Sequence, residues 1–169
     1  MGVMEGRQHI VTLGKLFDMI EQGYGFSISH RFESVGAGAS VNVYFENPTN
    51  SGKKVYLSII EIVSFAQAHV DIYRDNTKTA SGTSLTPQNL NLESANTSAV
   101  AAEYGGTYTT GTLSLNTICP GGSAIRAVGG AAEVGELLII PAGKNILVSV
   151  TNKSSSAADL SIRILWWEE

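Results

Sequence analysis

The last third of the chain reads as three consecutive β-strands, each bounded by turn residues. The expected strands are residues 136–140, 145–151 and 159–167, separated by Pro-Ala-Gly-Lys at 141–144 and by a polar loop at 152–156. In the last two strands, apolar residues alternate with Ser, Thr or Arg, which places one set toward a core and the other outward. The pattern therefore predicts a sheet into which the C-terminal strand is stitched.

Strand-like segments recur along the rest of the chain and end in Gly, Pro, Asn or Asp. Further strands are expected at residues 26–32, 40–45, 53–65, 68–73, 104–115 and 125–128. Segment 53–65 is long and apolar, so we expect a central strand with both faces covered and a bulge near Ile59 and Ile60. About eight to ten strands without a helix–strand rhythm predict an all-β chain, an antiparallel, jelly-roll-like β-sandwich.

Residues 10–22 have helical spacing instead. Apolar residues three and four positions apart form one stripe: Leu13, Leu16, Phe17 and Ile20. We expect a short amphipathic helix that either closes one end of the sandwich or packs on a neighbouring subunit. The chain is therefore divided into an N-terminal arm with this helix, 1–23, and a β-sandwich domain, 24–169.

Composition limits the kinds of partner. Charged residues make up 15% of the chain, against about 25% in typical soluble domains. The net charge is −4 with no basic run, so no nucleic-acid binding is expected. With no 18-residue apolar run and no visible secretory leader, no membrane association is expected either. The single cysteine, Cys119, cannot form an internal disulfide, and we interpret it as a small, partly buried residue.

The ionisable residues do not form a recognisable catalytic pattern, so no catalytic residue, metal ligand or cofactor is assigned. His30 and His69 could meet across strands and recruit Asp71 or Glu61, as in a cupin-type centre, which keeps a cupin-like or hydrolytic enzyme open as an alternative. Glu61, flanked by isoleucines, is expected to face outward or to pair with an arginine.

Aromatic residues are the main candidates for contacts with a partner. Trp166 and Trp167 are adjacent in a strand, so one is expected in the core, and the other exposed, covered by a loop or buried at a subunit contact. Residues 77–103 are expected to be mostly irregular, and long loops of this kind are often functional. The candidate interface residues are Leu13, Leu16, Phe17, Ile20, Tyr104, Tyr108, Trp166 and Trp167.

Two parts of the chain resemble small virion proteins of tailed phages and related viruses. Residues 45–48 (Phe-Glu-Asn-Pro) and 51–57 (Ser-Gly-Lys-Lys-Val-Tyr-Leu) are similar to strand–turn–strand segments of that group. Residues 140–145, 150–152 and 164–168 resemble the end of the same jelly-roll-like proteins.

The resemblance implies a non-enzymatic structural protein of a bacteriophage virion, either a capsid decoration protein or a head or tail accessory protein. Proteins of this group are commonly trimers, so the resemblance implies a homotrimer that binds a viral capsid or tail protein after assembly in the host cytoplasm. It carries no active site to this chain. The alternative is a carbohydrate-binding or receptor-binding β-sandwich, as at a fibre tip, with a glycan as ligand.

Overall fold

The computed structural model describes residues 15–121 and 138–169, which form one short helix and thirteen strands. The helix covers residues 15–21. The strands are β1 Gly25–Val35, β2 Ser40–Asn47, β3 Val55–Ser64, β4 Ala68–Arg74, β5 Thr77–Ala80, β6 Thr83–Leu85, β7 Gln88–Asn89, β8 Ala101–Tyr104, β9 Thr107–Thr109, β10 Thr112–Cys119, β11 Leu138–Ile140, β12 Lys144–Asn152 and β13 Ala158–Glu168.

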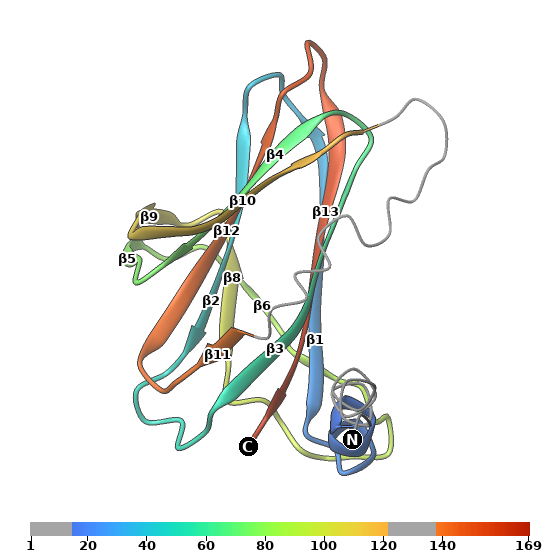
Figure 1. Ribbon diagram of the computed structural model, residues 1–169, viewed down its shortest axis with the longest axis vertical. Helices are drawn as coiled ribbons and strands as arrows, with labels where there is room; N and C mark the ends of the chain where they lie inside the picture. The colour runs from blue at the N-terminus through green and yellow to red at the C-terminus, as the bar shows by residue number, and fades with distance from the viewer. Residues whose placement is uncertain (1–14, 122–137) are drawn as a thin grey trace, which may run out of the picture.

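Two antiparallel sheets lie face to face, which confirms the predicted all-β sandwich (Figure 1). One sheet has five strands in the order β11-β3-β13-β1-β7, and the other has six in the order β10-β4-β12-β2-β8-β6. Strands β5 and β9 form a separate two-stranded sheet on the outer side of the six-stranded sheet (Figure 1).

The pairing of the long strands is nested. Strand β1 pairs with β13, β2 with β12, β3 with β11, and β4 with β10. The chain therefore behaves as one long hairpin whose two arms are rolled up together, which is the arrangement of a jelly roll. Strands β5 to β9 form an insertion between β4 and β10.

The core lies between the two sheets and follows the predicted alternation. In β13, the inward residues Leu160, Ile162, Ile164 and Trp166 are each at most 1% exposed. The Trp166 ring meets the Phe45 ring edge-on across the sandwich, with 5.0 Å between centroids. Cys119 is 3% exposed at the end of β10, so it is more fully buried than the partly buried residue that was expected.

Strand β3 differs from the prediction on its outer face. Its burial alternates along the strand, and Ile59 is 37% exposed, so only the inner face is fully covered. The predicted bulge is present, because the register shifts between the pairs Leu165–Ile59 and Trp166–Leu57 and leaves Ser58 as the extra residue. The alternation slips at this place because two outward residues follow each other.

The middle of the chain is more regular than expected. Segment 77–103 contains three short strands and part of a fourth, and all of them are too short to show a period in the sequence. The predicted strand 104–115 is divided among the end of β8, β9 and the start of β10, by breaks at residues 105–106 and by a turn at 110–111. A Cβ atom at Gly111 would collide with the backbone of Arg74 and Asp75, so the turn needs a glycine. The predicted strand 125–128 lies outside the described residues.

Candidate interaction surfaces

Both tryptophans that were candidates for an interface are buried within the chain. Trp166 is 0% exposed in the core and Trp167 is 3% exposed on the other side of the sheet. The Trp167 ring stacks on Tyr56, with 5.2 Å between centroids, and packs against Leu16 and Met19 of the helix. The cover of the outward tryptophan is thus the N-terminal helix, and neither ring offers appreciable surface to a partner.

The predicted helical stripe is split between two environments. Leu16 is 7% exposed and Ile20 is partly buried against the cluster around Trp167, whereas Phe17 is 63% exposed. Leu13 lies outside the described residues. Within the described part of the stripe, Phe17 is therefore the residue that a partner can reach.

The two candidate tyrosines stack on other aromatic rings of the chain. Tyr104 stacks on His30, with 3.7 Å between centroids, and meets Phe32 edge-on between the two sheets. Burial lowers the pKa of His30 below its ordinary value, so its ring is neutral at pH 7. Tyr108 stacks on Tyr44 with 5.0 Å between centroids. These contacts use ring faces that a sugar platform would need to present.

The residues considered for a cupin-like centre lie on three different surfaces. His30 faces inward from β1, and His69 faces outward from β4 in the opposite sheet. Glu61 faces outward from β3, where its carboxylate lies 3.6 Å from the Arg163 guanidinium, so the predicted pairing with an arginine is confirmed. In the described part of the chain, no three His, Cys, Asp or Glu side chains are grouped as metal ligands.

A ladder of side chains crosses the outer face of the six-stranded sheet. The strand registers place the following residues side by side: Leu113, Tyr73, Leu147, Tyr44, Glu103 and Ser84. Leu147 and Tyr44 are only 2% and 4% exposed, although they point away from the core. The β5–β9 sheet lies on this side, and Tyr108 from β9 and Lys78 from β5 cover the Tyr44 ring.

A buried carboxylate holds the β5–β9 sheet in this position. Glu103 is 8% exposed, its Oε2 lies 3.4 Å from Lys78 Nζ, and its Oε1 accepts a hydrogen bond from the Tyr108 hydroxyl at 3.0 Å. Burial raises the pKa of Tyr44 to about 12, with smaller contributions from nearby carboxylates. Burial and the bond to Glu103 also raise the pKa of Tyr108. Both phenols stay protonated at neutral pH, which suits a clamp better than proton transfer.

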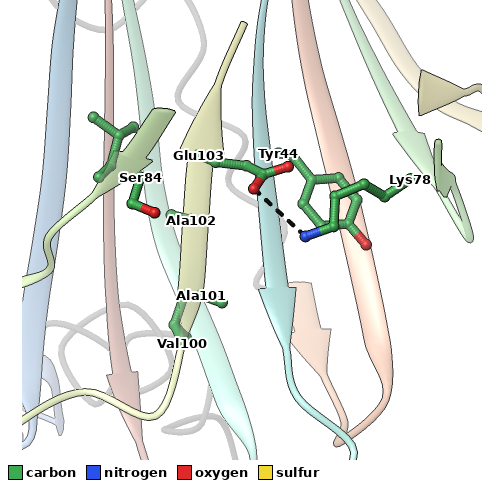
Figure 2. A pocket seen from close by; sticks show the side chains of 8 residues that line it. Tyr44, Lys78, Ser84, Val100, Ala101, Ala102 and Glu103 are labelled. Carbon is green, nitrogen blue, oxygen red and sulfur yellow. Dashed lines mark hydrogen bonds and ion pairs between the residues drawn. The ribbon is translucent and has the colours of Figure 1, made fainter. Parts of the chain in front are cut away.

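A shallow cleft of about 280 Å³ lies beside this clamp (Figure 2). Its walls come from Tyr44, Lys78, Ser84, Leu85 and residues 100–103. Figure 2 shows Glu103 reaching from β8 toward Tyr44 and Lys78, on the side away from Ser84. Because both Glu103 oxygens already have partners within the chain, the cleft offers a ligand mainly neutral polar groups and the apolar floor.

The outer face of the five-stranded sheet is covered by the helix at one end only. The registers of β3, β13 and β1 place Tyr56, Trp167 and Gly25 in a row at the helix end. Three further rows follow, which we call the open face: Ile59, Leu165 and Ser27; Glu61, Arg163 and Ser29; and Val63, Ser161 and Arg31. Each residue of the open face is exposed or half-buried.

The open face combines apolar residues with charges of both signs. The Arg163 and Glu61 side chains are 48% and 33% exposed, and farther along β1, Arg31 pairs with Glu33 at 2.8 Å. A shallow groove of about 310 Å³ lies over the row of Glu61 and the row of Val63. Ile139 on β11, next to Tyr56, adds a residue that is 51% exposed at the edge.

Glu168 is a structural residue that the sequence analysis did not single out. It is 2% exposed, and Oε1 accepts hydrogen bonds from Trp166 Nε1 at 3.1 Å and from the Ser98 hydroxyl. The backbone N–H of Ala99 lies 3.1 Å from both carboxylate oxygens. This side chain therefore ties the 90–100 segment to the end of β13. A glutamate near the end of a chain carries no sequence signal for such a role.

Two buried asparagines act in the same way at strand ends. Asn152 is 0% exposed, and its Nδ2 donates to the carbonyls of Val35 and Ser156 at 2.8 Å. Asn47 is also 0% exposed and donates to the carbonyls of Lys53 and Ile140 at 2.9 Å. Asparagine is equally common in exposed turns, so the sequence did not reveal these contacts.

No protein-family model, curated protein or solved structure matches the chain. In residues 15–121 and 138–169, no helix is long and apolar enough to cross a membrane. The fold and the chemistry of its surfaces are therefore what point to a function.

Proposed function

We propose that the protein is a non-enzymatic structural component of a bacteriophage virion, either a capsid decoration protein or a head or tail accessory protein. It acts by self-association and by binding a viral shell or tail protein. The observation that supports this most is the nested strand pairing, because jelly rolls of this kind are the building blocks of many capsid proteins.

The surfaces favour this function over the other uses of the same fold. Jelly rolls also occur in cupins and lectins, so the fold does not decide between them. The residues that a cupin-like centre would need lie on separate faces, and the aromatic rings that a lectin would present are stacked within the chain. What the described surface offers instead is a broad sheet face with apolar residues and paired charges.

The assembly and location follow from the same proposal. The resemblance of the sequence to small phage virion proteins favours a homo-oligomer, with a trimer as the usual state, that is assembled in the host cytoplasm and carried in the virion. Closed symmetric oligomers are the usual form of such self-association.

Immunogold electron microscopy of purified virus particles tests this function. Antibodies raised against the purified chain should label particles from a culture of the phage that encodes it, at the shell or at the tail. The protein should also sediment with the particles. Particles that lack both the label and the protein would overturn the proposal.

A glycan-binding or receptor-binding module is the second candidate, and the cleft beside Glu103 is the observation that favours it. Lys78 and Ser84 at its rim could donate hydrogen bonds to sugar hydroxyls. A glycan array should then show binding that is lost in Ser84→Ala and Lys78→Ala variants. An array without any binding would exclude this function and leave the structural one in place.

A further inference from the structure

We propose that the open face of the five-stranded sheet is the surface on which a second copy of this chain docks, face to face, to form a two-fold dimer. The inference deepens the proposed function, on which it rests for the expectation of self-association. It also departs from the trimer that the resemblance implies, because a face that meets itself joins two chains.

The first argument is the apolar character of outward positions. A sheet with one wet face normally places polar residues outward. The open face instead presents Ile59, Val63 and Leu165. On the six-stranded sheet, the outward row beyond the β5–β9 sheet contains Asn42 and Ser149, together with Asp71 and Asn116. The next outward row carries one large apolar residue, Ile118, beside His69 and Thr151.

Other apolar residues on the outer faces of the two sheets are covered by the chain itself. Tyr44 and Leu147 are 4% and 2% exposed because the protein covers that part of the six-stranded sheet itself. Trp167 at the helix end of the five-stranded sheet is likewise covered, by Leu16 and Met19. The described residues leave the open face uncovered, as they do Leu113 and Ile118 on the edge strand of the other sheet, and a second copy would remove the open face from water.

The third argument is charge. In a two-fold contact the same patch lies on both sides, so a patch of one sign would repel itself. The open face and its border carry two cations and two anions: Arg31 and Arg163, and Glu33 and Glu61. Rotating one copy can therefore bring each charge toward an opposite one, whereas a partner with a strong single charge would meet as much repulsion as attraction.

The size of the face sets the expected strength. Three strands spaced ~4.8 Å apart and five residues long at ~3.3 Å each give a flat area of about 240 Å² for the three rows. Protruding side chains enlarge this area, and Ile139 on β11 extends it at the edge of the sheet. Stable complexes bury ~800 Å² per partner, so this contact is smaller than the standard size, and the dimer should be weak and form toward the upper end of the micromolar range.

A charge-exchange experiment tests the docking surface. The variants Glu61→Arg and Arg163→Glu are purified separately, and their masses are measured by size-exclusion chromatography with light scattering from about 1 to 100 µM. Wild type should approach twice its chain mass of 17.9 kDa. Each single variant should be monomeric, with a dissociation constant raised at least about tenfold, because like charges then face each other.

An equimolar mixture of the two variants should form the dimer again. One chain then carries two arginines at these positions and the other two glutamates, so both contacts across the two-fold axis become attractive. Each variant also loses the ion pair between Glu61 and Arg163 within its own chain, which could destabilise it. Misfolded chains would not recover the dimer on mixing, so the recovery excludes this explanation. The matched control is Lys144→Glu, which breaks an exposed ion pair with Asp75 on the other sheet and should leave the dimer unchanged.

A second variant addresses the apolar part. Ile59→Ser should also give a monomer, with an unchanged circular dichroism spectrum. The docking surface would be overturned if all three variants, Glu61→Arg, Arg163→Glu and Ile59→Ser, associated as well as the wild type. The proposed structural function would still stand in that case. A three-chain species would overturn the face-to-face dimer, and a wild-type monomer at 100 µM would do the same, whereas failure of the structural function itself would show in the particle labelling.

Discussion

The Glu168 carboxylate provides the sharpest test of how this fold is held together. Glu168→Ala removes the acceptor for Trp166 Nε1, for the Ser98 hydroxyl and for the backbone N–H of Ala99. The Trp166 side chain is 0% exposed, so water cannot easily replace the lost partner at its N–H group. The Ser98 hydroxyl can rotate to another acceptor, so it should contribute little to the loss.

The size of the effect follows from these contacts. A buried donor that loses its acceptor costs about 1–3 kcal/mol, and the Trp166 Nε1–H group is such a donor. The N–H group of Ala99, a half-buried residue, also loses its acceptor and adds a smaller cost. We expect Glu168→Ala to lower the free energy of unfolding by about 2–4 kcal/mol. For a chain of this length each kcal/mol corresponds to ~2–4 °C, so the melting temperature should fall by about 5–15 °C.

Glu168→Gln is the matched control for shape. The amide keeps one acceptor oxygen for Trp166 but replaces charged hydrogen bonds by neutral ones, so it should cost about 1–2 kcal/mol. Urea unfolding followed by tryptophan fluorescence at one protein concentration measures both variants. A loss below about 0.5 kcal/mol for the alanine variant, or equal losses for both, would refute the reasoning.

Three further predictions concern other parts of the molecule. The pKa of Tyr44 is about 12 in the folded chain against an ordinary 10, so the unfolded chain releases this proton first as the pH rises. Stability should therefore be complete below pH 10 and fall by about 1–2 kcal/mol between pH 10 and 12, a slope that Tyr44→Phe should reduce in urea unfolding at a series of pH values. Leu16→Ala should lower the free energy of unfolding by about 2–3 kcal/mol because it opens the cluster under the helix. Phe17→Ala changes a residue that is 63% exposed, so it should alter the stability of the monomer by less than about 0.5 kcal/mol. Equal losses for the two variants in thermal melts at low protein concentration would contradict the helix packing. Gly111→Ala should lower the free energy of unfolding by about 2–3 kcal/mol, because the new Cβ atom collides with the backbone of Arg74 and Asp75. Gly38 has open space around it but a φ of 74°, so Gly38→Ala should cost only about 1 kcal/mol in the same thermal melts. The opposite order of the two losses would contradict the close backbone contact at Gly111.

The long strands were predictable because a strand with one buried face has apolar and polar residues in alternation along the sequence. Strand β13 shows this most clearly, and its inward residues Leu160 to Trp166 are those that the alternation selected. The short strands β5 to β8 were not predictable in this way, because strands of two to four residues cannot display a period. The split between β9 and β10 depended on the backbone closeness at Gly111, which no pattern of side chains records.

For the candidate surfaces, the sequence supplied only part of the geometry. The sequence pointed to Trp166 and Trp167 as contact residues because adjacent positions in a strand face opposite ways, and that part of the argument is correct. It could not show that Leu16 and Met19 would cover Trp167, since the contact joins residues about 150 positions apart. The register that brings Glu61 beside Arg163 likewise depends on how β3 and β13 are paired.

The amino-acid sequence by itself determined that this chain is built from alternating strands around one apolar core, because that information is local and repeats along each strand. The tertiary structure decided the nesting of the strands, the burial of both tryptophans, the clamp around Glu103 and the location of the open face. These features depend on which distant segments of the chain come to lie side by side. That choice is decided by the sum of many weak contacts over the whole fold, and no short stretch of residues contains this information.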